Sequence, residues 1–503
     1  MTTEGTLSAL FTSGVEKESV ALVSPEDGQA ITFAALERSV LQLAGRLSVV
    51  GVERGDRVAV VLPNGPEFVQ ILLAITTLGA AAAPLNPAYT ADEYSFYLRD
   101  LQPRLLLVSA GELQVARQAA GPEVAIVDVV VSEQQSPGLA IDGHEVEQEQ
   151  TFDVGVAGDI ALLLHTSGTT SRPKQVPLLQ RNLMASARTI AAHYALGPAD
   201  VSYVAMPLFH VHGLVASVFG AFAAGGSAIV PRRFSPQRFW GQARIHGVTW
   251  FSAGPTLHQM ILDKQATEVA PPTLRFTRSC SSAMSPALMQ RLEDVYGVPL
   301  LEAYGMTEAS HQMASNPLPP QARVPGTVGV STGTEIRVVD GEGADVPVGS
   351  SGEVVIRGSG VTPGYLNNPD ANKEAFRDGW FRTGDRGTLE DGYLRLQGRI
   401  KEMILRGGEN ISPYEIEGVL LTHSAVTDAV CFAVTDELYG EEVEAAVVVR
   451  GPIEERALRE FCRERLAAFK VPKIIRIVEQ IPRTPTGKLQ RRRVAALLDE
   501  ADR

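Results

Sequence analysis

Residues 160–174 read IALLLHTSGTTSRPK, a short apolar run followed by a segment rich in hydroxyl groups. An apolar run of this length, Ile160–Leu164, is typical of a buried strand. The segment His165–Lys174 then brings together backbone N–H groups, hydroxyl groups and one lysine, which suits the oxygens of a phosphate chain. The residue order of a Walker A loop is absent. A phosphate-binding loop is one interpretation of the segment, and a flexible surface loop is the other.

Helices and strands alternate ahead of this segment. Apolar residues recur at helical spacing at Leu36, Val40, Leu43 and Leu47. Arg57–Leu62 and Arg104–Ser109 are typical of buried strands, and Asn64–Pro66 favours the start of another helix. Such alternation implies parallel sheets with helices on both faces. We predict an α/β fold, whose large N-terminal domain consists of mostly parallel sheets flanked by helices.

A second, smaller domain is predicted at the C-terminal end. The polar stretch Ser132–Gln150 is interpreted as a surface excursion, and Gln397–Glu402 is the better boundary. The residues beyond it have their own strands and helices, predicted at Ala429–Val434, Ala445–Arg450, Ile474–Val478, Glu454–Leu466 and Gln490–Leu498. That is enough for a small α+β domain. The predicted domains are residues 1–398 and 399–503.

The composition limits the class of partner. The chain has 503 residues, 45% of them hydrophobic, and a formal net charge of −13. This balance argues against nucleic acid as the main partner. The apolar stretches Ile71–Pro84 and Leu214–Val230 are too short and too interrupted for membrane spans. The three cysteines indicate no disulfide or metal framework, and no secretory signal is visible. We expect a cytoplasmic protein, either monomeric or homodimeric.

Three further segments carry groups that suit a nucleotide. Glu308, in Tyr304–Glu308, could hold Mg²⁺ together with phosphate oxygens, or could be a solvated glutamate. The aspartate of Trp380–Asp385, interpreted as lying at a turn, could bind ribose hydroxyls or could cap its own backbone. Arg399 has the same two interpretations. Lys488, in Pro485–Lys488, is either a reactive lysine or a solvated one.

These segments in this order resemble the core motifs of the acyl-adenylate-forming superfamily. That superfamily includes acyl-CoA synthetases, luciferases and the adenylation domains of peptide synthetases. The segments that carry the resemblance are His165–Lys174, Tyr304–Glu308, Thr383–Asp385, Gly398–Glu402 and Thr486–Lys488. The resemblance covers essentially the whole chain. It implies an AMP-forming acid–thiol ligase that uses ATP, Mg²⁺ and coenzyme A, with a small C-terminal domain that moves over a larger one.

The resemblance also implies roles for individual residues in adenylation. The β- and γ-phosphates would be held by Thr166, Ser167, Gly168, Thr169, Thr170 and Lys174. Glu308 would bind Mg²⁺, and Thr307 would contact the α-phosphate. Asp385 and Arg399 would hold the ribose hydroxyls. The adenine would be framed by Ser282, Ala283, Ala303 and Tyr304. Lys488 would bridge the attacking carboxylate and the α-phosphate, offsetting their repulsion.

Other residues are implied in the transfer to coenzyme A. Lys401 matches the position at which the family turns its C-terminal domain. Gly407 and Gly408, in the segment Gly407–Asn410, would line the channel for the pantetheine arm, because glycine allows close approach of the backbone. His210 resembles the family's gate residue between the acid pocket and that channel. A histidine that only packs in the core is the alternative for His210.

The chain departs from the usual family loop, S-G-T-T-G-x-P-K-G, because Ser171 and Gln175 replace two glycines. This variant, together with Arg278–Ser282 and Tyr304–Pro317, resembles the oxalate–CoA ligase branch. Polar residues lie in segments that the family uses for the acid, namely His210, His212, His258, Arg278, Ser279, Ser281 and His311. Arg278 is predicted as a bidentate anchor for a second carboxylate. Each of these residues could instead be a satisfied structural polar group.

Other functions remain open on the sequence alone. The acid could be a medium- or long-chain fatty acid or an aromatic acid. The enzyme could load the thiol of a carrier protein, although Gly407–Asn410 and Phe469–Pro472 favour coenzyme A. A nucleotide-binding protein without catalytic activity is a third possibility, against which Lys174, Glu308 and Lys488 argue. A kinase-type phosphotransferase is disfavoured because the chain has no Walker A or kinase loop.

Overall fold

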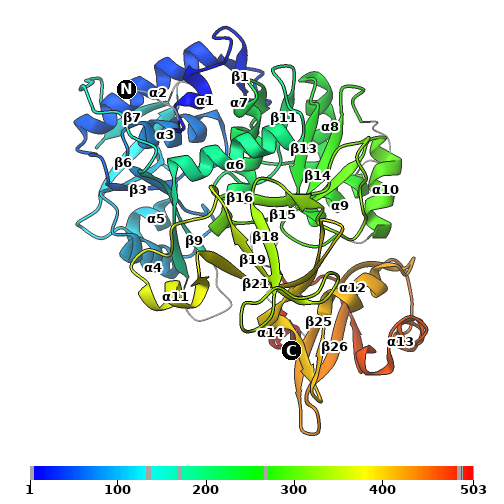
Figure 1. Cartoon of the computed structure of the whole chain (residues 1–503). Coiled ribbons are helices and arrows are strands. Elements are labelled where there is room, and N and C mark those ends of the chain that lie inside the picture. Colours follow the sequence, from blue (N-terminus) through cyan, green and yellow to red (C-terminus); the bar gives the residue numbers. More distant parts are fainter. Residues whose placement is uncertain are drawn as a thin grey trace.

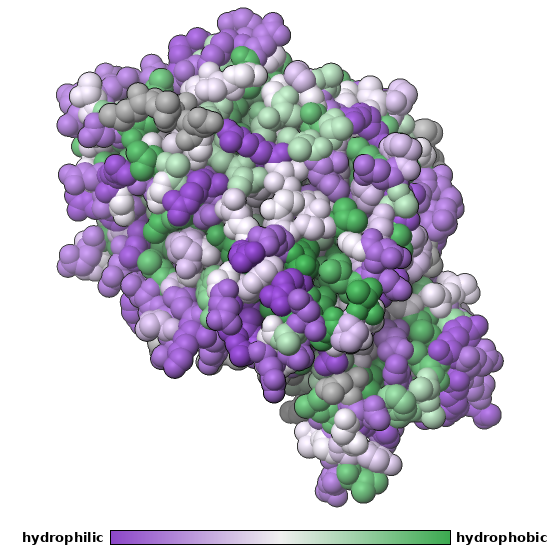
Figure 2. Space-filling model, viewed as in Figure 1, coloured by the Kyte–Doolittle hydropathy of each residue, from purple (hydrophilic) through white to green (hydrophobic). Residues whose placement is uncertain are grey.

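A large lobe and a small lobe make up the protein in this computed structural model (Figure 1). The structure describes residues 5–131, 137–166, 173–264, 270–284, 286–483, 489 and 491–501. The small lobe, drawn in orange and red, projects from one end of the large lobe. Figure 2 shows the small lobe at one corner of the large lobe. The residues predicted for function are distributed over both lobes and the segment that joins them.

One sheet of the large lobe has a parallel centre. Along the sheet, the order of its strands in the described residues is β10 (Lys174–Leu179), β9 (Ile160–Thr166), β4 (Ala81–Pro84), β3 (Arg57–Val61), β5 (Leu105–Ser109), β6 (Ala125–Val131), β7 (Pro137–Ile141) and β8 (His144–Glu145). The strands from β9 to β6 are parallel, whereas β10, β7 and β8 are antiparallel to their neighbours. Pro66 begins the helix after β3 in its first turn, as predicted.

The other sheet of the large lobe is longer and mixed. Within the described residues its strands follow the order β18 (Glu335–Val339), β19 (Gly352–Arg357), β21 (Trp380–Glu390), β22 (Tyr393–Arg399), β17 (Val330–Ser331), β16 (His311–Ser315), β15 (Leu300–Met306), β14 (Phe276–Ser279), β13 (Trp250–Ala253), β11 (Val201–Val204), β12 (Ser227–Ile229), β1 (Val20–Val23) and β2 (Ala30–Thr32). β20 (Phe376–Arg377) pairs with β21. The strands from β15 to β1 are parallel, and the part from β16 to β18 is antiparallel.

Helices fill the space between and around the two sheets. The long ones are α2 (Phe33–Val49), α3 (Pro66–Thr77), α4 (Ala91–Leu101), α6 (Gln180–His193), α8 (Pro236–Ile245), α9 (Pro255–Lys264) and α10 (Pro286–Tyr296). The shorter ones are α1 (Ala9–Thr12), α5 (Gln114–Ala119), α7 (Gly220–Ala223), α11 (Pro369–Ala375), the π-helix η1 (His212–Phe219) and the 3₁₀ turn η2 (Thr307–Ala309). α6 contacts β9 and β10 of one sheet and β16 of the other. It therefore joins the two sheets around one hydrophobic core.

The small lobe has a sheet and a core of its own. Its strands are β23 (Ile404–Arg406), β24 (Glu409–Ile411), β25 (Val426–Asp436), β26 (Gly440–Val449) and β27 (Ile474–Ile477). Its helices are α12 (Pro413–Leu421), α13 (Glu455–Arg463), α14 (Arg491–Ala501) and the short turn η4 (Ala468–Lys470). The hydrophobic clusters of this lobe contain residues from Ile404 onward only. Between Arg399, which ends β22, and Ile404 lies one short turn, η3 (Ile400–Glu402).

The predicted α/β class is confirmed, and two local predictions need correction. The described part of Ser132–Gln150, residues 137–150, is not only a surface excursion, because β7 and β8 extend the eight-stranded sheet and Leu139 is fully buried. The glutamates and glutamines around these short strands hid their pattern. Trp380–Asp385 is not an open turn, because it forms the first half of β21. No described helix has the length and apolar character needed to cross a bilayer.

Candidate active site

Thr166 and Lys174 hold the two ends of the predicted phosphate loop side by side. Thr166 is the last residue of β9, Lys174 is the first residue of β10, and the two are paired in the antiparallel ladder. Ser167, Gly168, Thr169 and Thr170 lie outside the described residues. The strand pairing therefore brings the first predicted phosphate contact next to the predicted countercharge.

Gln175, which replaces a family glycine, is hydrogen-bonded to a neighbouring helix. Its Nε2 lies 2.7 Å from the backbone oxygen of Asp100 in α4 and 2.6 Å from the Oδ2 of that residue. His165 Nε2 lies 2.8 Å from the same Oδ2, and burial lowers the pKa of His165. Both residues at the base of the loop thus bind one carboxylate. The side chain of Gln175 provides this link to α4, which a glycine could not.

Lys174, Tyr365 and Glu308 form a chain of contacts beside the loop. Lys174 Nζ lies 4.5 Å from the centre of the Tyr365 ring, at a distance typical of a cation–π contact. The Tyr365 hydroxyl donates to Glu308 Oε1 at 3.0 Å. Thr307, next to Glu308, begins the 3₁₀ turn η2 directly after β15. Two residues predicted from separate motifs are therefore brought together, through a tyrosine that the sequence did not reveal.

Glu308 fits a magnesium ion that is bound mainly by a nucleotide. Its carboxylate is buried, and only one oxygen, Oε1, has a hydrogen-bond donor among the described residues. Groups of three or more metal-ligating side chains are absent from the described parts of the chain. Mg²⁺ in nucleotide enzymes takes one or two carboxylates and completes its shell with phosphate oxygens and water. A single fixed carboxylate beside a phosphate loop suits that arrangement.

Tyr304, Asp385 and Arg399 form a second group, drawn from three strands of the longer sheet. Asp385 in β21 is paired directly with Arg399 in β22, and Arg399 Nε lies 2.8 Å from Asp385 Oδ1. The Tyr304 hydroxyl donates to the other oxygen of the same carboxylate. Burial, and then the Asp385 charge, raise the pKa of Tyr304 well above its ordinary value, so the hydroxyl keeps its proton. The carboxylate is thus held from two sides.

The predicted adenine contacts lie on β15 and on the loop that follows β14. Ala303 and Tyr304 are buried in β15, whereas Ser282 and Ala283 are exposed in the loop that follows β14. β14 and β15 are adjacent parallel strands, so these segments meet at one edge of the sheet. A flat ring could lie between the buried strand and the exposed loop. The residues predicted to frame the adenine therefore lie toward the carboxyl ends of these two parallel strands, where ligands of parallel sheets commonly bind.

A polar cluster lies around Arg278 in β14. Arg278 is fully buried, and its guanidinium donates to the Tyr194 hydroxyl at 2.8 Å, to Ser252 Oγ at 2.7 Å and to His311 Nε2 at 2.9 Å. The rings of His311 and His212 are stacked, with their centres 5.0 Å apart. Burial and the Arg278 charge hold the pKa of both histidines well below the ordinary value, so both are neutral. In the described chain, Arg278 forms no ion pair with a carboxylate.

Other residues predicted for the acid are placed differently. Ser281 is exposed, and its Oγ lies 2.9 Å from His212 Nδ1. Ser279 lies next to Arg278 in β14, and because side chains alternate along a strand, it faces the opposite side of the sheet. His258 packs against Phe251 and bonds to the backbone oxygen of Arg278, so it belongs to the core.

Two family models match this chain. The model described as AMP-binding enzyme matches residues 12–366, and the model described as AMP-binding enzyme C-terminal domain matches residues 415–488. Together they cover most of the sequence. This chain belongs to the AMP-binding enzyme family.

Relatives of this AMP-binding enzyme include two oxalate–CoA ligases. That of Arabidopsis thaliana is 46% identical over 92% of this chain and 93% of its own, and that of Saccharomyces cerevisiae is 39% identical over 100% and 99%. The ATP-bound structure of MatB from Rhodopseudomonas palustris is 28% identical, covers 99% of this chain and 98% of its own, and gives a TM-score of 0.87. The predicted resemblance and the predicted class, an AMP-forming acid–thiol ligase, are confirmed.

Several predicted residues of the AMP-binding enzyme lie in or near the small lobe. Lys401 is exposed in η3, and Gly407 and Gly408 form the exposed turn between β23 and β24. Both glycines have positive φ, which a two-residue hairpin turn requires. Lys488 lies outside the described residues. On the large-lobe side, His210 lies in the loop that leads into η1, where its ring packs against Phe209.

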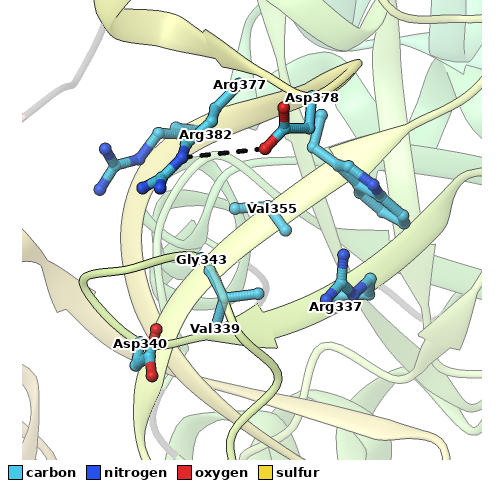
Figure 3. Close-up of a pocket in the computed structure, with 9 residues that line it drawn as sticks. Arg337, Val339, Asp340, Gly343, Val355, Arg377, Asp378 and Arg382 are labelled. Atoms are coloured by element: carbon cyan, nitrogen blue, oxygen red, sulfur yellow. Dashed lines mark ion pairs between the residues drawn. The ribbon is translucent and has the colours of Figure 1, made fainter.

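The pocket in Figure 3 lies apart from these residues. It is lined by β18, β19, β20 and β21, and Trp380 and Arg382 are on its side of β21. Asp385 lies on the other side of that strand, as the alternating burial along β21 shows. Arg337, Arg377 and Arg382 are each paired with a neighbouring acid. Asp385, which was predicted to hold the ribose, therefore does not face this pocket.

Sequence reasoning missed Tyr194, Ser252 and Tyr365. Ser252 is one serine in an apolar strand, and only the pairing of β13 with β14 puts it opposite Arg278. Tyr194 follows α6, far from Arg278 in the sequence. Tyr365 lies beyond the recognised motifs. The only sequence signal for these residues is a polar group in an apolar neighbourhood, which is too common to identify a site.

Proposed function

We propose that the enzyme activates oxalate with ATP as an acyl-adenylate and then transfers the acyl group to coenzyme A. The observation that carries this proposal is the polar cluster around Arg278, which occupies the segments predicted for the acid. A fatty acid needs an apolar surface, whereas a second carboxylate needs hydrogen-bond donors and positive potential. The names of the two oxalate–CoA ligase relatives support the same choice.

In the first half-reaction, one carboxylate oxygen of oxalate attacks the α-phosphorus of ATP, and the bond to pyrophosphate breaks. No general base is needed, because the nucleophile is already ionised. Asp385, with Tyr304 and Arg399 on its two oxygens, would hold the ribose hydroxyls. Lys174 and the hydroxyl-rich loop would neutralise the departing pyrophosphate. Glu308 would hold Mg²⁺, which would supply further positive charge to the phosphate oxygens.

Lys488 would bind the attacking carboxylate and the α-phosphate at the same time. Its ammonium group would reduce the repulsion between two anions, which is the main obstacle to this step. On either side of the segment that contains it, Arg483 and Leu489 form a β-bridge. Farther on, Arg491 Nε lies 3.3 Å from Glu402 Oε2 in η3. These contacts connect residues that flank the segment to each other and to the turn between the lobes.

In the second half-reaction, the sulfur of coenzyme A attacks the acyl carbonyl, and AMP leaves. We propose that residues 1–398 and 399–503 act as separate domains and that the chain turns near Lys401 between the two half-reactions. Among the described residues, the polar contacts across the boundary include the hydrogen bond from Ser412 to the backbone oxygen of Gln397 and the ion pair of Arg450 with Asp263, whose side chains are exposed. Figure 2 shows hydrophobic residues on the large lobe beside the junction, a surface suited to contact with a moving small lobe. Gly407 and Gly408 would then line the coenzyme A channel, with His210 at its inner end.

The test is release of pyrophosphate with oxalate, malonate, glyoxylate, acetate, hexanoate and 4-coumarate, each with and without coenzyme A. We expect oxalate to give the largest kcat/KM and to yield a thioester with free coenzyme A. Preference for a monoacid would overturn the choice of oxalate and keep the enzyme class. Pyrophosphate release without thioester would favour a carrier-protein acceptor. No release with any of these acids would favour a protein without catalytic activity. The cytoplasmic location and the oligomeric state stay predictions.

A further inference from the structure

We propose that Arg278 is a positioning residue that fixes the protons of His311 and His212, so that His311 and, through His212, Ser281 present hydrogen-bond donors to the second carboxylate of the acid. This inference rests on the proposed function and changes the predicted part of Arg278 from a direct anchor to an indirect one.

The first branch runs from Arg278 to His311. A guanidinium group can only donate hydrogen bonds. Its Nη2 lies 2.9 Å from His311 Nε2, so that nitrogen must be the acceptor, and the single proton of the neutral ring must be on Nδ1. A methyl group built on Gly305 would lie 3.1 Å from this Nδ1. The Nδ1–H donor therefore faces the segment that carries Tyr304 and Glu308.

The second branch runs through Ser252 to His212. Arg278 Nη1 donates to Ser252 Oγ at 2.7 Å, and the same Oγ lies 2.7 Å from His212 Nε2. If the hydroxyl gives its one proton to Nε2, the His212 proton is on Nδ1 and binds Ser281 Oγ at 2.9 Å. If Nε2 of His212 instead carried the proton, Ser252 Oγ would accept from both Arg278 and His212. The proton of the fully buried Ser252 hydroxyl would then have no acceptor among the described contacts, which is costly.

The two branches leave hydrogen-bond donors on His311 and Ser281, next to the buried positive charge of Arg278. When Ser281 Oγ accepts the proton of His212, the hydroxyl proton of Ser281 is available to a ligand, because the Ser281 side chain is exposed. Arg278 is fully buried behind the stacked histidines, and its Nε is bonded to Tyr194. Three of its five N–H groups are bonded to Tyr194, Ser252 and His311, and the whole side chain is buried, so we assign it charge and proton placement in place of direct contact with the acid.

The backbone at both ends of the network supports a function. The backbone φ is +81° at Ser281 and +103° at His311. Residues other than glycine rarely adopt a positive φ. Strained residues of this kind persist where the surrounding structure holds them, and they cluster at ligand sites. In this protein the two strained residues are His311, the last residue of the first branch, and Ser281, the last residue of the second. Their side chains are thus held in place at a cost to the backbone.

The test uses Ser252→Ala, with Ser202→Ala as its matched control. Ser202 is an equally buried serine in the neighbouring strand β11, and its hydroxyl has no hydrogen-bond partner among the described residues. For Ser252→Ala we expect KM for oxalate to rise about tenfold or more, which corresponds to one lost hydrogen bond to a charged group, while KM for ATP stays unchanged. Ser202→Ala should change neither value. An unchanged KM for oxalate in Ser252→Ala would overturn the second branch.

A second measurement needs no substrate. Nitrogen-15 NMR of histidine-labelled protein reports which ring nitrogen carries the proton. We expect Nδ1–H for His212 and His311, loss of that preference for His212 in Ser252→Ala, and Nε2–H for His258, which donates to a backbone oxygen in every variant. His212 or His311 protonated on Nε2 in the unchanged protein would overturn the inference. Failure to turn over oxalate would overturn the proposed function and leave these protonation states intact.

Discussion

Asp385 and Arg399 face each other across β21 and β22, and the 2.8 Å contact between them lies where the chain leaves the large lobe. Arg399 is the last residue of β22, and the turn with Lys401 follows at once. Burial alone would lower the pKa of the Arg399 guanidinium, but the Asp385 carboxylate raises it, so the pair stays charged. The group proposed to hold the ribose is therefore attached directly to the segment proposed to turn.

The first prediction concerns Asp385→Asn. This change keeps the size of the side chain and removes the charge opposite Arg399, so we expect KM for ATP to rise about tenfold or more. KM for the acid should change by less than about threefold. The control is Asp391→Asn, at an exposed position between the two strands whose positive φ asparagine tolerates. Equal losses for ATP and acid would contradict the ribose assignment.

The second prediction concerns Glu308→Gln. An amide binds Mg²⁺ more weakly than a carboxylate, so we expect the Mg²⁺ concentration for half-maximal pyrophosphate release to rise about tenfold or more. Tyr365→Phe removes only the hydrogen bond to Glu308 Oε1 and should give a smaller shift in the same direction. Magnesium titrations of both variants at saturating ATP test this. A fall in kcat with no change in the Mg²⁺ requirement would argue against Glu308 as the metal ligand.

The third prediction separates the two half-reactions. Lys488→Ala should abolish pyrophosphate release and leave the reaction of supplied acyl-AMP with coenzyme A largely intact, because the charge of Lys488 is proposed to act only in the first step. Lys473→Ala, which removes an exposed lysine of the small lobe, is the control. Comparable losses in both half-reactions would show that the role given to Lys488 is wrong.

The elements with strong local patterns could be predicted from the sequence. The apolar run of Arg57–Leu62 predicts β3, and Asn64–Pro66 predicts the start of α3, because proline suits the first turn of a helix. β7 was not predicted, because its short apolar pattern lies among glutamates and glutamines. Gly384 favours a turn at this position in the sequence. In the structure, β21 continues through Gly384, which has a positive φ.

The chemistry of the site could be predicted only in part. The motifs revealed residue types and their order, and the structure brings Lys174 near Glu308 and Asp385 next to Arg399. Ser279 and Arg278 were both predicted to bind the acid, and as neighbouring residues of β14 they point to opposite faces of the sheet. The partners of Arg278 come from other strands and helices, so only strand register and packing could reveal them.

The last prediction concerns the stability of the large lobe. Glu302, buried in β15 beside Ala303, has its pKa raised to about 7 by burial, against 4.5 in an unfolded chain. The folded protein therefore binds this proton more tightly than the unfolded chain does. The resulting stabilisation is complete below about pH 4.5 and is lost as the pH rises through about 7. Above that pH the folded protein has to hold a buried carboxylate.

Glu302→Gln should remove this dependence, because its amide has no proton to lose in this range. At pH 8 we expect the variant to be more stable than the unchanged protein, by at most about 3 kcal/mol, and the difference should shrink towards pH 5. Urea unfolding of the large lobe at pH 5, 6.5 and 8 measures this. Glu390→Gln, at an exposed position of β21, should show no such trend. A difference that grows towards low pH would mean that Glu302 is stabilised as a carboxylate in the folded protein.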